Sequence, residues 1–199
     1  MKKQVIAAAV LCTLLSGAAI AQQAKEGPWM VRVRAVHLDS ANGDTTGLGL
    51  SVNNKTIPEV DVSYFFNKNL AAELILTVPQ KHTLSSTALG GAIGTLKHLP
   101  PTLLVQYHFD GMAVKPYVGA GINYTHFSSV NLPAGVDIDR NSFGLAVQAG
   151  VDIPLSGNLY LNFDVKKAYI RTDVSAAGAK IGTFKVDPVL VGVGLGWRF

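Results

Sequence analysis

Cysteine is nearly absent from this sequence of 199 residues. The one cysteine, Cys12, lies in an apolar stretch near the N-terminus and follows Leu11, where a lipoprotein signal requires a small residue. Without that stretch the chain has no thiol, which excludes disulfide bonds and cysteine-based metal sites. The five histidines are scattered and do not form the set of three or four ligands that zinc requires, so we predict no metal and no cofactor.

Charged residues are also scarce, at 15% of the chain, against about 25% in a typical soluble domain. The mean hydropathy is positive, which excludes intrinsic disorder. Beyond the N-terminal segment, no run of about 18 apolar residues occurs, so the pattern of a transmembrane helix is missing. The sequence also has no Lys- and Arg-rich run, and we therefore expect no nucleic-acid partner.

The first 21 residues have the three parts of a secretory signal peptide. Lys2 and Lys3 are positive, residues 5–15 are apolar, and Ala19-Ile20-Ala21 forms a small-x-small cleavage site. We therefore predict a signal peptide over residues 1–21 and a single domain over residues 22–199.

The rest of the chain alternates between apolar and other residues with a period of two, which is typical of β-strands. Across residues 118–125, for example, Val, Ala, Ile and Tyr alternate with Gly, Gly, Asn and Thr. About eight such segments occur, each close to the length that crosses a bilayer at a tilt. Short turns at residues 67–69, 110–115 and 154–158 alternate with longer segments at residues 40–57, 79–99, 127–141 and 171–187.

These features predict an all-β fold, an eight-stranded antiparallel transmembrane β-barrel with short periplasmic turns and longer extracellular loops. A soluble barrel of the lipocalin type is the alternative, and it would point its apolar face inward. Aromatic residues at the ends of the apolar faces favour the membrane barrel, because such residues gather at membrane interfaces. These aromatic residues are Trp29, Tyr64, Phe66, Tyr107, Phe109, Trp197 and Phe199.

The C-terminus follows a Gly-x-x-aromatic-x-aromatic pattern formed by Gly194, Trp197 and Phe199. This ending resembles the signal by which the assembly machinery of the bacterial outer membrane recognises barrels. We therefore expect that machinery and outer-membrane lipid to be partners, and the bacterial outer membrane to be the location.

Several segments resemble the OmpW family of bacterial outer-membrane proteins. They are His98-Leu99-Pro100-Pro101-Thr102-Leu103-Leu104 followed by Gln106-Tyr107, and residues 73–82, 115–125, 144–152 and 186–199. The resemblance implies an eight-stranded barrel with a narrow, partly apolar lumen, and a role in the passage of small hydrophobic molecules. The segments at residues 40–57 and 127–141 look shorter than is usual in the family. Solute choice and recognition by phage or bacteriocins are therefore the properties least expected to transfer.

The inward face, assigned by alternation, carries a set of polar residues. We expect oppositely charged members to pair, because an isolated charge in a dry lumen costs several kcal/mol. A packed core without a conduit is the simplest interpretation of most of these charges. The predicted polar network contains Arg32, Arg34, Asp61, Glu73, Gln106, His108, Gln148, Asp152, Asn162, Asp164, Lys166 and Arg198.

Apolar residues also occur on the inward face, where a water-filled pore would have polar groups. They predict a hydrophobic vestibule that opens outward, with Ile75 and Leu104 as gate residues; the alternative is that they only plug the barrel. Pro100-Pro101 indicates a break in the strand ladder, and hence a lateral exit toward lipid. The lumen-lining candidates are Met30, Val36, Leu38, Ile75, Leu104 and Leu190.

Catalysis is not expected from this chain. It has no Gly-x-Ser-x-Gly motif and no evident serine beside a histidine and an orienting group. His82 and His98 flank one segment, and we interpret them as polar residues at the base of a loop. The sequence therefore predicts a narrow channel or vestibule for small hydrophobic molecules. The alternative is a non-conducting structural or receptor barrel, acting as an adhesin or as a binding site for phage or bacteriocins.

Overall fold

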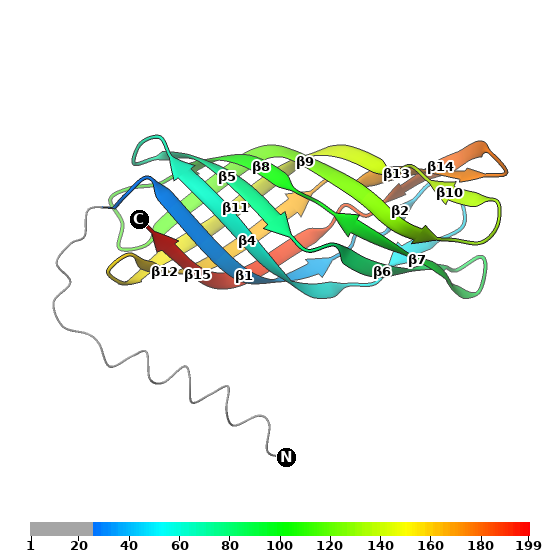
Figure 1. Cartoon of the computed structure of the whole chain (residues 1–199), viewed down its shortest axis with the longest axis horizontal. Helices are drawn as coiled ribbons and strands as arrows, with labels where there is room; N and C mark the ends of the chain where they lie inside the picture. Colours follow the sequence, from blue (N-terminus) through cyan, green and yellow to red (C-terminus); the bar gives the residue numbers. More distant parts are fainter. Residues whose placement is uncertain (1–25) are drawn as a thin grey trace, which may run out of the picture.

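Eight antiparallel strands form the wall of a closed barrel in the computed structural model, which describes residues 26–199 (Figure 1). The barrel closes where the first and last wall strands pair, with Val31 opposite Trp197 and Asp39 opposite Val189. The predicted signal peptide lies outside the described residues. The wall strands are β1 (Trp29–Asp39), β4 (Lys55–Phe65), β5 (Leu70–Thr77), β8 (Thr102–His108), β9 (Lys115–Asn131), β11 (Asn141–Ser156), β12 (Leu159–Ala168) and β15 (Val189–Arg198).

Alternation along each strand separates the two faces of the wall. In β1, the side chains of Arg32 and Arg34 are 0% and 2% exposed, whereas Val33 between them is 55% exposed. The apolar face thus points outward, opposite to the arrangement in a lipocalin-type barrel, and the predicted membrane-barrel fold is confirmed. Among residues 26–199, the structure has no helix of the length and apolar character needed to span a membrane.

Short turns join the wall strands at one end of the barrel, the end at which the C-terminus lies (Figure 1). They lie between β4 and β5, between β8 and β9, and between β11 and β12, as the sequence predicts. An Asx-type turn closes the first of them, because the Asn67 side chain accepts hydrogen bonds from the backbone N–H groups of Asn69 and Leu70.

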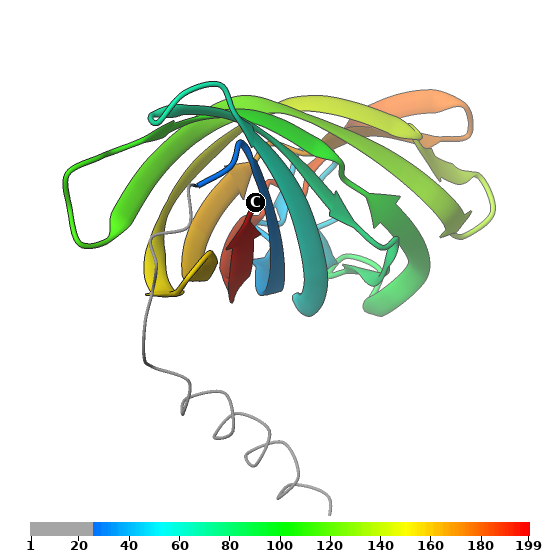
Figure 2. The same ribbon diagram turned by 60° about the vertical axis from the view of Figure 1, so that its left-hand side comes forward.

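At the opposite end, the longer connections that the sequence predicts as loops contain further strands. They form an outer extension that continues the wall (Figures 1 and 2). In one hairpin, Ala177 and Gly178 both have positive φ, as a two-residue turn between antiparallel strands requires. The strands of the outer extension are β2 (Gly43–Asp44), β3 (Leu50–Val52), β6 (Gln80–Ser86), β7 (Gly91–Leu99), β10 (Val136–Ile138), β13 (Arg171–Ala176) and β14 (Ala179–Lys185).

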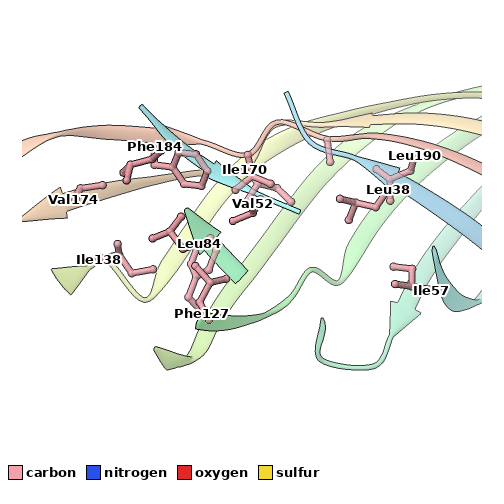
Figure 3. Close-up of a cluster of buried hydrophobic side chains, with 14 of the residues drawn as sticks. Leu38, Val52, Ile57, Leu84, Phe127, Ile138, Ile170, Val174, Phe184 and Leu190 are labelled. Carbon is pink, nitrogen blue, oxygen red and sulfur yellow. The ribbon is translucent and has the colours of Figure 1, made fainter. Parts of the chain in front are cut away.

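A large apolar cluster fills the outer extension and the adjoining part of the barrel (Figure 3). It joins Leu38 and Leu190 of the wall to Phe127 at the boundary and to Phe184 in the extension. These side chains explain why the extension folds: its short strands bury a common apolar core instead of remaining exposed loops.

Candidate functional site

Two arginines organise the polar interior of the barrel. Arg32 donates from Nε and Nη2 to the two carboxylate oxygens of Asp152, at 3.1 and 2.7 Å. Its Nη1 donates to Asp61 Oδ1 at 3.1 Å and to Ser63 Oγ at 2.9 Å. The paired contact with Asp152 fixes both the position and the plane of the guanidinium group.

Arg34 lies two residues farther along β1, on the same inward face. Its Nη1 donates to Glu59 Oε1 at 2.8 Å, its Nη2 to Glu73 Oε1 at 3.1 Å, and its Nε to Asn162 Oδ1 at 2.6 Å. Lys166 then donates to the same Glu59 oxygen at 2.7 Å, which extends the network to β12. Each charge in the buried network thus has an opposite charge beside it.

Tyr117 and two glutamines complete the network on the far wall. Tyr117 donates to Asp164 Oδ2 at 2.8 Å, and Gln148 donates to the same oxygen at 2.7 Å. Gln106 donates to Gln148 Oε1 at 2.9 Å, and its own Oε1 lies 3.0 Å from His108 Nε2. All these side chains are buried, so the network fills the cross-section of the barrel at this level.

The structure places every predicted polar residue inside the barrel, and it brings all but Arg198 into this network. Arg198 lies at the short-turn end, where its Nε donates to Gly27 O at 2.9 Å and its Nη1 pairs with Glu26 at 2.9 Å. Sequence reasoning missed Glu59 and Tyr117, because each lies one residue before an alternating segment, which begins at Val60 or at Val118. Continuing the period of two by one step places both on the inward face.

Next to the network lies a collar of three apolar side chains, Ile75, Leu104 and Ala146. Ile75 is the cross-strand partner of Asp61, and Leu104 is the partner of Glu73. The collar therefore borders the polar network directly, and it contains both predicted gate residues.

A cavity of about 30 Å³ borders the collar on the side of the outer extension. Its lining includes Ile75, Leu38 and Leu190, and Glu59 and Lys166 of the network also reach it. Val36 belongs to the apolar cluster above. Met30 does not join these residues, because it packs at the short-turn end of the barrel.

The cavity reaches the wall where the ladder between β5 and β8 ends. The last paired residues are Ile75 and Thr102, while Thr77 and Pro100 line the cavity beyond them. The Asn123 side chain donates to the Thr102 hydroxyl at 2.7 Å, and it makes a weaker hydrogen bond to Pro100 O at 3.3 Å. The carbonyl of Pro100 is thus bonded from β9, and no ladder pair joins it to β5 among the described residues.

In the outer extension, His82 of β6 and His98 of β7 form a stacked pair with ring centroids 4.6 Å apart. Both lie at the base of the β6–β7 hairpin, and both are buried. Burial, together with the neighbouring His82 and Lys55, lowers the pKa of His98 to about 3. Both rings therefore remain neutral at physiological pH. No group of three or more His, Cys, Asp or Glu within residues 26–199 is arranged to hold a metal ion.

The comparisons with known proteins agree with this geometry. The model of the OmpW family matches residues 25–199. The chain is 35% identical to outer membrane protein W of Escherichia coli K12, over the full length of both. It is 42% identical to the uncharacterized outer-membrane protein y4mB of Sinorhizobium fredii, over 86% of this chain and 80% of the relative.

Two further comparisons concern more distant proteins. The dibenzothiophene metabolism operon protein PahQ of Pseudomonas aeruginosa is 28% identical, over 88% of this chain and 90% of the relative. The crystal structure of the outer membrane protein OprG of the same species superposes with a TM-score of 0.77 at 27% identity, over 89% of this chain and 98% of that one.

Proposed function

Because this chain belongs to the OmpW family of outer-membrane β-barrel proteins, we propose that it forms a narrow channel or vestibule for small hydrophobic molecules. One observation carries the proposal: an apolar cavity lies directly on a sealed polar network. A solute that enters from the outer extension meets the side chains of Leu38, Leu190 and Ile75. Each Å² of apolar surface that it buries there contributes about 25 cal/mol.

The same geometry opposes the passage of ions. Arg32, Arg34 and Lys166 are held by five buried carboxylates, and moving through them requires breaking several charge-assisted hydrogen bonds. We therefore infer that a solute leaves sideways, through the wall between the end of β5 and Pro100. That part of the wall has no ladder bond to separate.

The substrate class draws support from one relative. The name of PahQ refers to an operon for dibenzothiophene metabolism, and dibenzothiophene is an apolar aromatic compound. The cavity of about 30 Å³ has room for about one water molecule. A molecule the size of dibenzothiophene therefore enters only when side chains of both the apolar cluster and the collar move apart.

Uptake into liposomes that carry the refolded protein tests the proposal. An apolar fluorescent probe is offered from outside while ionic current is recorded on the same preparation. Probe uptake with little current supports the hydrophobic conduit. Neither uptake nor current, from a barrel shown to be folded by heat-modifiable gel mobility, favours the sealed structural or receptor barrel.

Two opposite changes in the collar sharpen this test. Ile75→Ala widens the cavity, and Leu104→Ala loosens the collar that borders it; each is expected to raise the rate of probe uptake. Ala146→Phe fills the cavity and is expected to lower the rate. Ala149→Phe is the matched control, because Ala149 lies on the same strand but on the outward, lipid-facing side. Equal uptake by all folded variants would remove the collar from the mechanism.

A further inference from the structure

Lys81 of β6 and Lys97 of β7 lie directly opposite each other in the outer extension. Their chain neighbours His82 and His98 are buried, so both lysines are on the outward face of the sheet. Directly opposite side chains have Cβ atoms about 4.5–5.5 Å apart, and like charges at such positions destabilise a sheet. The pair therefore needs a compensating negative charge.

No carboxylate of the described residues supplies that charge, because neither lysine has an ion pair within 4.0 Å. The outer extension contains a second cross-strand pair of like charge, Arg171 opposite Lys185. There Asp187 lies 3.2 Å from Arg171 Nη2 and compensates the pair. The difference singles out Lys81 and Lys97 as an uncompensated cationic pair.

Three hydroxyl side chains lie next to this pair. Thr83 lies opposite Thr95 on the same face, two residues along each strand from the lysines. Ser128 of β9 lies opposite Lys97 on the other side. Two ammonium groups surrounded by hydroxyls form a surface suited to the oxygens of a phosphate group.

The position of the two lysines relative to the membrane indicates that the phosphate belongs to a lipid head group. Val78, directly after β5, is the last exposed apolar residue before Lys81, which follows it by three residues. At about 3.3 Å per residue and a strand tilt of about 45°, the lysine lies roughly 7 Å above the lipid-facing band. The head-group region of a bilayer is about 5–7 Å thick on each side, and a lysine side chain extends into it readily.

We propose that Lys81 and Lys97 bind a phosphate group of the lipids in the outer leaflet of the membrane, assisted by the hydroxyl groups of Thr83, Thr95 and Ser128. The site anchors the outer extension to the lipid surface. It lies on the outer face of the barrel, separate from the cavity, and does not depend on solute passage.

Lipid binding by the purified full-length protein tests the proposal. The probe is a diphosphorylated glucosamine lipid (lipid A) added to the protein in non-ionic detergent, with binding followed by native mass spectrometry. Lys81→Gln/Lys97→Gln is expected to bind at least about tenfold more weakly than the unaltered protein. Lys180→Gln/Lys185→Gln carries the same change of charge on β14 and is expected to bind like the unaltered protein, as is Lys81→Arg/Lys97→Arg.

Three results would overturn the proposal: equal binding by the two glutamine variants, equal binding of the lipid after its phosphates are removed, or full competition by millimolar inorganic phosphate.

Thermal unfolding gives a second readout. In phosphate-free detergent, the single change Lys81→Gln relieves repulsion, so its midpoint is expected to lie at or above that of the unaltered protein. Added lipid A then raises the midpoint of the unaltered protein more than that of the variant. A larger or equal rise in the variant would contradict the site.

Discussion

At the scale of single residues, buried charge is the main determinant of the interior. Arg34 alone contacts Glu59 and Glu73, and its Nη1 also lies 2.9 Å from Asp61. A charge with several opposite partners on different strands ties those strands together. Its removal leaves each buried partner with one cation fewer, because Glu59 keeps only Lys166 while Asp61 and Glu73 keep only Arg32.

The substitution Arg34→Leu is expected to destabilise the barrel by about 3–5 kcal/mol, because three buried carboxylates each lose one of their two cations. Urea unfolding in detergent, followed by the fluorescence of Trp29 and Trp197, measures the change. Val33→Ala is the control on the same strand, since Val33 faces outward. A free energy of unfolding that falls no further than in this control would show that the network does not stabilise the barrel.

Residue by residue, the sequence predicts which side chains lie inside, but not their partners. Alternation assigns Arg34 to the lumen because its neighbours Val33 and Ala35 are apolar. The pairing of Arg34 with Glu59 depends on the register between β1 and β4, in which these two residues are direct partners. Register follows from turn geometry and packing along whole strands, which a local pattern does not contain.

Gly194 shows how one residue can satisfy two requirements. It belongs to the predicted assembly signal, yet a Cβ atom at this position would lie 2.0 Å from the Val33 carbonyl oxygen. Packing against β1 therefore excludes a side chain here, whether or not the assembly machinery reads this position.

At the scale of elements, the packing of β6 and β7 in the outer extension depends on two buried histidine rings that stay neutral. His82 and His98 stack on each other and have no acidic partner among the described residues. The ring nitrogen His82 Nδ1 lies 2.9 Å from Asn53 O, which fits a neutral ring that donates from that atom. Protonation would place a positive charge beside Lys55 and beside the second ring.

Acidification is therefore expected to weaken the outer extension. The pKa of both rings is lowered in the folded state, mainly by burial, so the unfolded chain takes up protons that the folded chain does not. The stabilising contribution is complete above the ordinary histidine pKa of about 6.5. It declines as the pH falls from there toward about 3, where His98 itself titrates in the folded state.

Thermal unfolding at pH 7.5 and at pH 4.5 measures this effect. His82→Gln/His98→Gln is expected to lower the midpoint at pH 7.5 and to reduce the difference between the two pH values. His37→Gln, at an exposed position, provides the control for replacing a histidine. An unchanged difference in the double variant would assign the pH dependence to other groups.

The outer extension also marks a limit of sequence reasoning at this scale. Residues 80–86 alternate as regularly as the wall strands, with His82, Leu84 and Ser86 buried. Because Leu84 is the one apolar residue among them, alternation of hydrophobicity does not mark residues 80–86 as a strand. The apolar core that makes them strands comes from distant parts of the chain, such as Phe127 and Phe184.

At the scale of the whole molecule, the two ends of the described chain meet at one seam. The backbone N–H of Phe199 donates to Trp29 O at 2.8 Å, and that of Trp29 donates to Phe199 O at 3.0 Å. Fold class and location could be predicted from the sequence because strand length, alternation and a closed wall are requirements of the bilayer itself.

Phe199→Ala tests the predicted assembly signal without breaking this seam. The change removes the aromatic ring and keeps both backbone hydrogen bonds between Trp29 and residue 199. It is expected to slow assembly in cells while leaving the stability of the refolded barrel nearly unchanged. Pulse-labelled protein that acquires heat-modifiable mobility measures the rate of assembly. Phe143→Ala, which removes an exposed outward ring, is the control. Equal rates in the two variants would contradict a role of Phe199 as a signal.

The seam between β1 and β15 also determines when the protein can finish folding. Trp29 and Phe199 are separated by almost the whole described chain, and their pairing closes the largest possible loop. Folding rates fall as contacts become more distant in sequence, so closure is expected to be late and slow. Until the last strand arrives, β1 keeps an open edge on which another chain could add a strand. The period before closure is therefore the time at which this protein is most exposed to aggregation.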